Sequence, residues 1–188
     1  MSDQGTEGLL SPYLRKKRIQ AAAPHLKGRV LDFGCGSGAL ATLIEPDKYL
    51  GYEIDSDSIQ QAQILYPKHC FTSELPESSN KFDTIVSLAV IEHISDPIEF
   101  LRILAAYLNE TASSSQIVVT TPHPLFDWVH YLGAKIGLFS KSANEEHEDL
   151  LNRSKLEFVG KQARLMLISY RRFLFGANQI AIYTKGSK

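Results

Sequence analysis

Short apolar runs alternate with amphipathic stretches from Gly28 onward. Five runs have the length and apolar content of buried strands, near residues 29–33, 49–53, 69–72, 83–88 and 116–121. The stretches between them predict helices near 38–45, 57–65 and 96–109. Strands that alternate with helices indicate βαβ units in an α/β, doubly wound, mostly parallel sheet. In such sheets ligands bind at the carboxyl ends of the strands.

A helix is predicted before the first strand, because Ser11 and Pro12 are typical of a helix start. We expect it to reach about Ala23, so that residues 1–27 form an N-terminal helical extension. This helix carries four basic residues in succession, Arg15-Lys16-Lys17-Arg18. Four charges on a short terminal helix favour a solvated face, and a phosphate-binding patch is the alternative.

The second half of the chain departs from the βαβ rhythm. Residues 122–148 join a dense apolar segment to a charged one, and we expect a lid-like insertion over the crevice. A helix is predicted near 149–160. Two further strands, 165–174 and 178–184, are separated by a turn short enough for an antiparallel hairpin.

Composition narrows the class of protein. A length of 188 residues predicts a single domain, and 44% hydrophobic with 22% charged residues is typical of a globular one. Twenty Lys and Arg against 21 Asp and Glu give a net charge of −1, which argues against nucleic acid as a partner. No apolar run is long enough for a membrane span. Two cysteines make no disulfide framework, and the first residues contain no signal-peptide core, so we expect a cytoplasmic protein.

The most informative segment is a buried-type strand that leads into three glycines, Val30-Leu31-Asp32-Phe33-Gly34-Cys35-Gly36-Ser37-Gly38. Glycines between a strand and a helix let backbone approach a ligand closely. The spacing also fits a dinucleotide fingerprint, with Glu53 placed to bind a ribose. A carboxylate at Asp32, however, would repel a pyrophosphate at the mouth of the loop. S-adenosylmethionine carries an ammonium and a sulfonium instead, and suits an acidic entrance.

These residues carry a family resemblance. Together with Gly51-Tyr52-Glu53-Ile54-Asp55, Leu75-Pro76, the run 82–87 and Ile91-Glu92-His93-Ile94, they resemble the class I S-adenosylmethionine-dependent methyltransferases. The resemblance implies a Rossmann-like, seven-stranded sheet with one antiparallel strand, here 178–184. It also implies the cofactor S-adenosyl-L-methionine and a single methyltransferase domain.

The resemblance further implies roles for individual residues. The loop would surround the methionine part of the cofactor, through Asp32, Gly34, Cys35, Gly36 and Gly38. Glu53 would hold the ribose, Ile54 would lie against the adenine, and backbone near Leu88 and Ala89 would accept from the ammonium. An acidic residue often found after the third strand has no clear counterpart, so Thr72 or Ser73 would replace it. Cys35 is expected to pack rather than to react.

Methyl transfer requires alignment of the acceptor and exclusion of water, and a base only where the acceptor must lose a proton. His93 after the fourth strand and His123 after the fifth are the candidate catalytic residues, and His147 lies in the predicted lid. Each could instead cap a loop. No metal is expected, because the histidines and acids match no compact zinc spacing.

Two other functions compete with a methyltransferase acting on a small-molecule acceptor. A short-chain dehydrogenase would use Tyr131-x-x-x-Lys135, a pair that arises easily by chance. A non-catalytic methyltransferase-like subunit would keep the cofactor and serve a partner protein. The identity of the acceptor and the oligomeric state are not predicted by the sequence.

Overall fold

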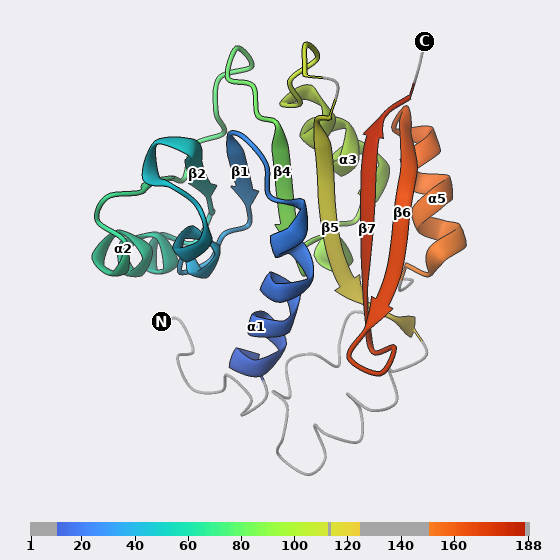
Figure 1. Ribbon diagram of the computed structural model, residues 1–188, viewed down its shortest axis with the longest axis horizontal. Helices are drawn as coiled ribbons and strands as arrows, with labels where there is room; N and C mark the ends of the chain where they lie inside the picture. Colours follow the sequence, from blue (N-terminus) through green and yellow to red (C-terminus); the bar gives the residue numbers. More distant parts are fainter. Residues whose placement is uncertain (1–10, 113, 125–150, 187–188) are drawn as a thin grey trace.

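The computed structural model describes residues 11–112, 114–124 and 151–186, which form one seven-stranded sheet in the order β3-β2-β1-β4-β5-β7-β6 (Figure 1). The strands are Val30–Phe33 (β1), Tyr49–Tyr52 (β2), Cys70–Thr72 (β3), Thr84–Leu88 (β4), Gln116–Pro122 (β5), Leu165–Phe173 (β6) and Asn178–Lys185 (β7). All seven match the predicted runs to within one or two residues.

The direction of the strands confirms the predicted fold class. β1 to β5 pair in parallel, whereas β7 pairs antiparallel with both β5 and β6. β7 is therefore the one antiparallel strand, and β6 again runs in the direction of β1 to β5. The carboxyl ends of six strands lie at one edge of the sheet, with the β6–β7 hairpin at that same edge.

Alternate residues of the central strands pack into two different cores. On β1, Leu31 belongs to one core and Val30 to the other. Burial of both faces explains why the strands read as continuous apolar runs rather than as an alternating pattern. The first core also takes Ile85, Ile117, Val119, Ala181 and Tyr183, and the second takes Val86, Val118, Ile180 and Ile182.

Helices cover both faces of the sheet (Figure 1). α1 (Ser11–Ala22) lies across one face, where Ala21 and Ala22 are buried against the second core. α3 (Pro97–Ala106) and α5 (Arg153–Gln162) cover the other face. α2 (Ser56–Leu65) precedes β3 at the opposite end of the sheet from β6. The N-terminal helix is thus one of the helices that close the sheet.

The connection from β1 to β2 differs from the prediction of a helix over 38–45. It holds two short 3₁₀ helices, η2 (Ala39–Leu43) and η3 (Pro46–Lys48). Only seven residues separate Gly38 from Pro46, and a proline forces the residue before it out of helical geometry. Glu45 is accordingly extended, with φ −62° and ψ 139°. A third 3₁₀ turn, η1 (Ala23–His25), ends α1, and η4 (Ile91–His93) follows β4.

The predicted insertion over 122–148 lies outside the described residues except for its first three. β5 ends at Pro122 and the described chain continues to Pro124. The predicted helix near 149–160 is α5, which begins at Arg153 with the side chain of Asn152 as its N-cap. Among the described helices, none is both long enough and apolar enough to cross a membrane.

Candidate functional site

The three glycines after β1 have different surroundings. All three adopt positive φ, at +79° for Gly34, +51° for Gly36 and +78° for Gly38. A Cβ on Gly34 would lie 2.5 Å from Val90, and a Cβ on Gly38 would lie 2.7 Å from the ring of Phe71. A Cβ on Gly36 would meet nothing within 4 Å. Gly34 and Gly38 are therefore required by packing, whereas Gly36 faces open space.

Glu53 fixes this loop to the end of β2. The N–H of Gly36 donates to Oε2 of Glu53 at 2.9 Å. The other oxygen, Oε1, accepts from the N–H of Ile54 at 2.8 Å and of Asp55 at 3.1 Å. One carboxylate thus holds two loops at the carboxyl edge of the sheet, where the sequence predicts the ribose.

An open cleft of about 1090 Å³ lies over the loop, between α1 and α2. Five predicted cofactor residues line it, namely Asp32, Gly34, Cys35, Gly36 and Leu88. Both signs of charge are present on its walls: α2 and the turn before it contribute Asp57 and Asp55, and α1 contributes Arg15 and Arg18. The cleft can therefore receive a ligand that carries both positive and negative groups.

Asp32 lies at the floor of the cleft, not at its mouth as the sequence predicts. Its side chain is only 3% exposed, and the hydroxyl of Tyr49 donates to Oδ2 at 2.8 Å. Burial and, to a smaller extent, the nearby Glu53 outweigh this hydrogen bond and raise the pKa of Asp32 to about 7. Without a cation near it, this carboxyl is partly protonated at neutral pH.

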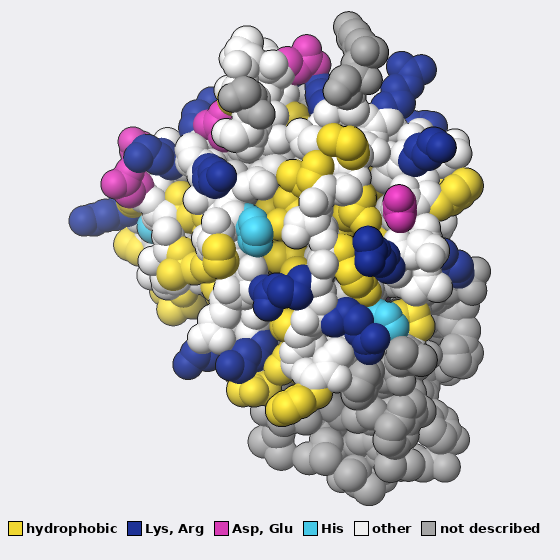
Figure 2. Space-filling model, turned by 45° about the vertical axis from the view of Figure 1, so that its right-hand side comes forward, with side chains coloured by type: hydrophobic (Ala, Val, Ile, Leu, Met, Phe, Trp, Pro, Cys, Tyr) yellow, Lys and Arg dark blue, Asp and Glu magenta, His cyan; other side chains and the backbone are white. Residues whose placement is uncertain are grey.

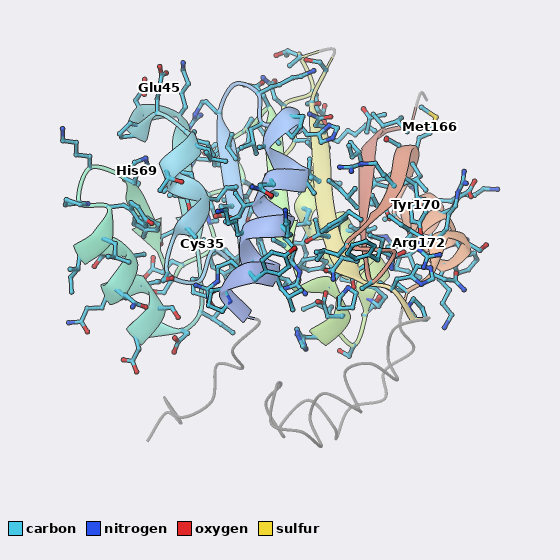
Figure 3. All side chains as sticks on the ribbon, turned by 60° about the horizontal axis from the view of Figure 1, so that its bottom comes forward. Cys35, Glu45, His69, Met166, Tyr170 and Arg172 are labelled. Carbon is cyan, nitrogen blue, oxygen red and sulfur yellow. The ribbon has the colours of Figure 1, made fainter. Side chains whose placement is uncertain are left out.

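Cys35 packs against the neighbouring strand β2. Its sulfur lies against Gly51 of β2, where a Cβ would come within 2.8 Å. Burial raises the pKa of the thiol, and the carboxylates of Asp32 and Glu53 raise it as well. A thiol in this environment stays protonated and does not act as a nucleophile. Figure 3 looks onto the carboxyl edge, with Cys35 on one side of α1 and Tyr170 and Arg172 of β6 on the other.

The chain turns sharply after β4. Ala89 has φ +58°, which is rare for a residue with a side chain, and its N–H donates to Thr120 O at 2.9 Å. Strained positions of this kind cluster at ligand sites. Leu88 lines the cleft and Ala89 follows it, so the backbone predicted to accept from an ammonium lies beside the glycine loop.

The residues predicted to contact an adenine lie at the exposed end of β2 and β3. Ile54 is 78% exposed, so most of its apolar side chain is not covered by the protein. Ser73 is exposed, whereas the Thr72 hydroxyl is already hydrogen-bonded with Glu74, whose N–H donates to it at 3.0 Å. Of the two candidates, Ser73 is the one with a hydroxyl available.

The two candidate catalytic histidines differ in environment, and neither is among the residues that line the cleft. His93 ends η4 and is exposed. His123 follows β5 and is buried, and its backbone N–H donates to Ala177 O at 2.9 Å. Burial and the charge of Arg172 lower the pKa of His123. His147 lies outside the described residues, and in the described part of the chain no cluster of potential metal ligands occurs.

A family model described as a methyltransferase domain matches residues 9–165, which is most of the chain. The chain belongs to the methyltransferase domain family. This membership confirms the family predicted from the motifs and argues against the short-chain dehydrogenase, whose Tyr131 and Lys135 lie outside the described residues.

Curated relatives match this methyltransferase domain over part of their length. A ubiquinone biosynthesis O-methyltransferase of Ruegeria pomeroyi is 29% identical over 87 residues, 39% of this chain and 34% of the relative. A probable S-adenosylmethionine-dependent methyltransferase of Mycobacterium tuberculosis is 31% identical over 111 residues, 55% of this chain and 39% of the relative. The matched part is thus little more than a third of the length of these relatives.

Solved structures share the fold of the methyltransferase domain. Magnesium protoporphyrin IX methyltransferase from Synechocystis, with bound S-adenosylhomocysteine, superimposes with a TM-score of 0.69 at 14% identity, over 97% of this chain and 90% of that one. An S-adenosylmethionine-dependent methyltransferase from Clostridium acetobutylicum gives 0.66 at 12% identity, over 95% and 97%.

One residue that lines the cleft, Arg18, lies in an environment that differs from the one the sequence analysis favoured. Arg18 is not on a solvated face: it is half-buried, and its Nε donates to Asn178 Oδ1 at 2.9 Å. Its charge lies near Glu92. Burial raises the pKa of Glu92 above its ordinary value, and the charge of Arg18 offsets part of that effect. One oxygen of Glu92 is buried without a hydrogen-bond partner. The apolar Ile19 and Ala22 beside Arg18 were the signal that this face of the helix packs inward.

Proposed function

We propose that this chain transfers the methyl group of S-adenosylmethionine to a small-molecule acceptor. The observation that carries the proposal is the surroundings of Gly36. Its backbone faces open space in the cleft, and its N–H is held by the carboxylate predicted to bind a ribose. Membership of the methyltransferase domain family supports the same activity.

The residues present fit this cofactor. The ammonium and sulfonium of the cofactor would lie on the side of the cleft that carries Asp32. A cation there stabilises the ionised form of the buried carboxyl and so lowers its pKa. The cofactor's carboxylate favours the arginines that α1 contributes. Glu53 would hold the ribose hydroxyls, and the exposed Ile54 would lie against the adenine. The names of relatives that are S-adenosylmethionine-dependent support this assignment.

The bound cofactor would supply a methyl group already activated by the sulfonium, so the protein's own work is to bind, orient and exclude water. An acceptor hydroxyl would also have to lose a proton. His123 would suit this role, because burial and the charge of Arg172 lower its pKa and favour the neutral imidazole that accepts a proton. The O-methyltransferase names of several relatives favour an oxygen acceptor. A cytoplasmic location remains part of the proposal.

Calorimetry of the full chain with S-adenosylmethionine, S-adenosylhomocysteine and NAD tests the cofactor. We expect binding of the first two and not of NAD; binding of NAD alone would exclude the proposal. Transfer of labelled methyl groups to small molecules of a cell extract tests the activity. Cofactor binding without transfer, restored when a protein fraction is added, would favour the non-catalytic subunit.

A further inference from the structure

The β6–β7 hairpin displays an aromatic side chain that the fold does not use. Phe175 is 101% exposed, so it contributes no buried area to either core. It also adopts φ +54°, directly after Leu174 at φ +52° and before Gly176 at φ +92°. Glycine, asparagine or aspartate is favoured at such positions because a Cβ is strained there. A bulky aromatic residue kept in a strained, fully exposed position indicates a role outside the fold.

The hairpin is held in a defined position at the carboxyl edge of the sheet. Nε and Nη2 of Arg172 donate to Gly176 O at 3.2 and 3.0 Å. The N–H of Gly176 donates to Phe173 O at 3.1 Å. Arg18 connects the hairpin to α1, because Asn178, its partner, is the first residue after the turn. The base of the hairpin is therefore in contact with α1.

α1 and the β6–β7 hairpin are both basic. The α1 sequence from 11 to 22 and the β6–β7 sequence from 165 to 185 contain no acidic residue, although the chain has 21. α1 exposes Lys16 and, at 49%, Tyr13, whose ring lies 5.5 Å from Nζ of Lys17. Figure 2 shows Lys and Arg side chains over the lower half of this side of the molecule, with no acidic side chain among the coloured residues there. We call this the basic surface, and define it by Tyr13, Lys16, Lys17, Arg171, Arg172 and Phe175.

We propose that the basic surface docks on an anionic lipid surface, with Phe175 inserted at the interface. Aromatic side chains prefer the boundary between headgroups and acyl chains, and Lys and Arg are attracted to anionic headgroups. The aromatic residue stands at the tip of a hairpin rather than in a groove, which suits insertion into a layer better than capture of a peptide. The proposal does not depend on the cofactor.

Sedimentation of the full chain with vesicles tests this inference. Vesicles of phosphatidylcholine with phosphatidylglycerol should bind the protein, vesicles of phosphatidylcholine alone should not, and added salt should release it. Inorganic phosphate and glycerol phosphate, added as competitors, should not displace it at moderate concentration. Displacement by either at low concentration would reveal a site for a free phosphate and overturn the proposal.

Variants separate docking from folding. Phe175→Asn places a favoured residue in the turn, so it should raise or preserve the melting temperature while reducing vesicle binding several-fold. Lys16→Gln with Lys17→Gln should reduce binding to the anionic vesicles by roughly fivefold per charge. The matched controls are Phe158→Asn, which removes another exposed phenylalanine, and Lys68→Gln with Lys161→Gln, which removes two charges elsewhere.

The controls should bind vesicles like the unmodified chain, and every variant should keep its affinity for S-adenosylmethionine. Equal vesicle binding by all variants would overturn the proposal. A dimer that Phe175→Asn disrupts would assign the surface to a second copy of the chain instead. Binding to single-stranded RNA in preference to vesicles would assign it to nucleic acid. If the unmodified chain does not bind S-adenosylmethionine, the proposed function is refuted and the lipid test is unaffected.

Discussion

Gly36 and Glu53 are joined by a hydrogen bond of 2.9 Å, from the backbone N–H of the loop after β1 to the carboxylate at the end of β2. The second carboxylate oxygen accepts from Ile54 and Asp55, so both oxygens are oriented before any ligand arrives. A binding group whose orientation is already set loses less entropy when it binds. The pair therefore couples the shape of the glycine loop to the group predicted to hold a ribose.

Glu53→Ala should weaken binding of S-adenosylmethionine by roughly 1.5–3 kcal/mol, the range for hydrogen bonds to a charged group. The reason is twofold: a ribose partner is lost, and the Gly36 N–H loses its acceptor. Calorimetry measures the effect. Glu45→Ala is the control, since Glu45 is exposed and pairs only with the neighbouring Lys48 among the described contacts. An unchanged dissociation constant for Glu53→Ala would place the ribose elsewhere.

Gly36→Val and Gly38→Ala should fail for different reasons. A side chain at Gly36 meets no protein atom within 4 Å, so Gly36→Val should fold, at a cost of about 1–2 kcal/mol for the left-handed backbone, and should not bind the cofactor. A Cβ at Gly38 would lie 2.7 Å from the Phe71 ring, so Gly38→Ala should lose more stability. Thermal melting and calorimetry on both variants check this. Equal melting temperatures with equal cofactor affinities would contradict it.

Stability of the cofactor-free chain should fall as pH rises from about 4 to about 7, as far as Asp32 is concerned. The pKa of Asp32 is about 7 in the folded chain, above its ordinary value, so the folded state binds the extra proton within that window. Asp32→Asn should abolish this part of the pH dependence in denaturant titrations. The free energy of unfolding of the variant, measured relative to that of the unmodified chain, should increase as pH rises. A difference that stays constant with pH would refute the assignment.

Cofactor binding should release a proton near pH 7 if its cationic groups lie near Asp32. A nearby cation favours the ionised carboxylate and lowers its pKa, so affinity should increase as pH rises towards about 7 and level off above it. Calorimetry in buffers of different ionisation enthalpy measures the proton, and Asp32→Asn should remove it. A binding enthalpy that is the same in all buffers would mean that the cation lies elsewhere.

Arg18→Gln should destabilise the fold by about 2 kcal/mol, because it removes the bond to Asn178 and leaves the partly buried Glu92 without a nearby guanidinium. Glu92→Gln in the same chain should recover part of this loss, since the uncompensated charge is then absent. A double-mutant cycle from denaturant unfolding gives the coupling energy. If the two single effects simply add, Arg18 and Glu92 are independent.

The sequence predicted the strands and the loop because their signals are local. Short apolar runs between turn residues specify buried strands, and three closely spaced glycines after a strand specify close backbone approach. The depth of Asp32 and the burial of Arg18 could not be predicted in this way. Both depend on partners far along the chain, Tyr49 for the first and Asn178 for the second.

The same limit applies to the three glycines. Their spacing is the same whether a glycine avoids a protein side chain or a ligand. Only the positions of Val90 and Phe71 show that Gly34 and Gly38 serve packing, which leaves Gly36 as the residue that faces the cleft. Predictions for the insertion at 122–148 beyond Pro124 remain predictions, as does a catalytic role for His123.

The short 3₁₀ turn at Ala39–Leu43 affects which anions the loop attracts. A long α-helix after a glycine loop aligns its peptide dipoles and presents the equivalent of half a positive charge to a phosphate. Five residues of 3₁₀ helix align few dipoles, so this loop has little such field. Selection of a ligand here therefore depends on individual side chains, among them the buried carboxyl of Asp32 and the arginines that α1 contributes. The loop keeps the glycine spacing of a dinucleotide site without the long helix whose dipole would attract a pyrophosphate.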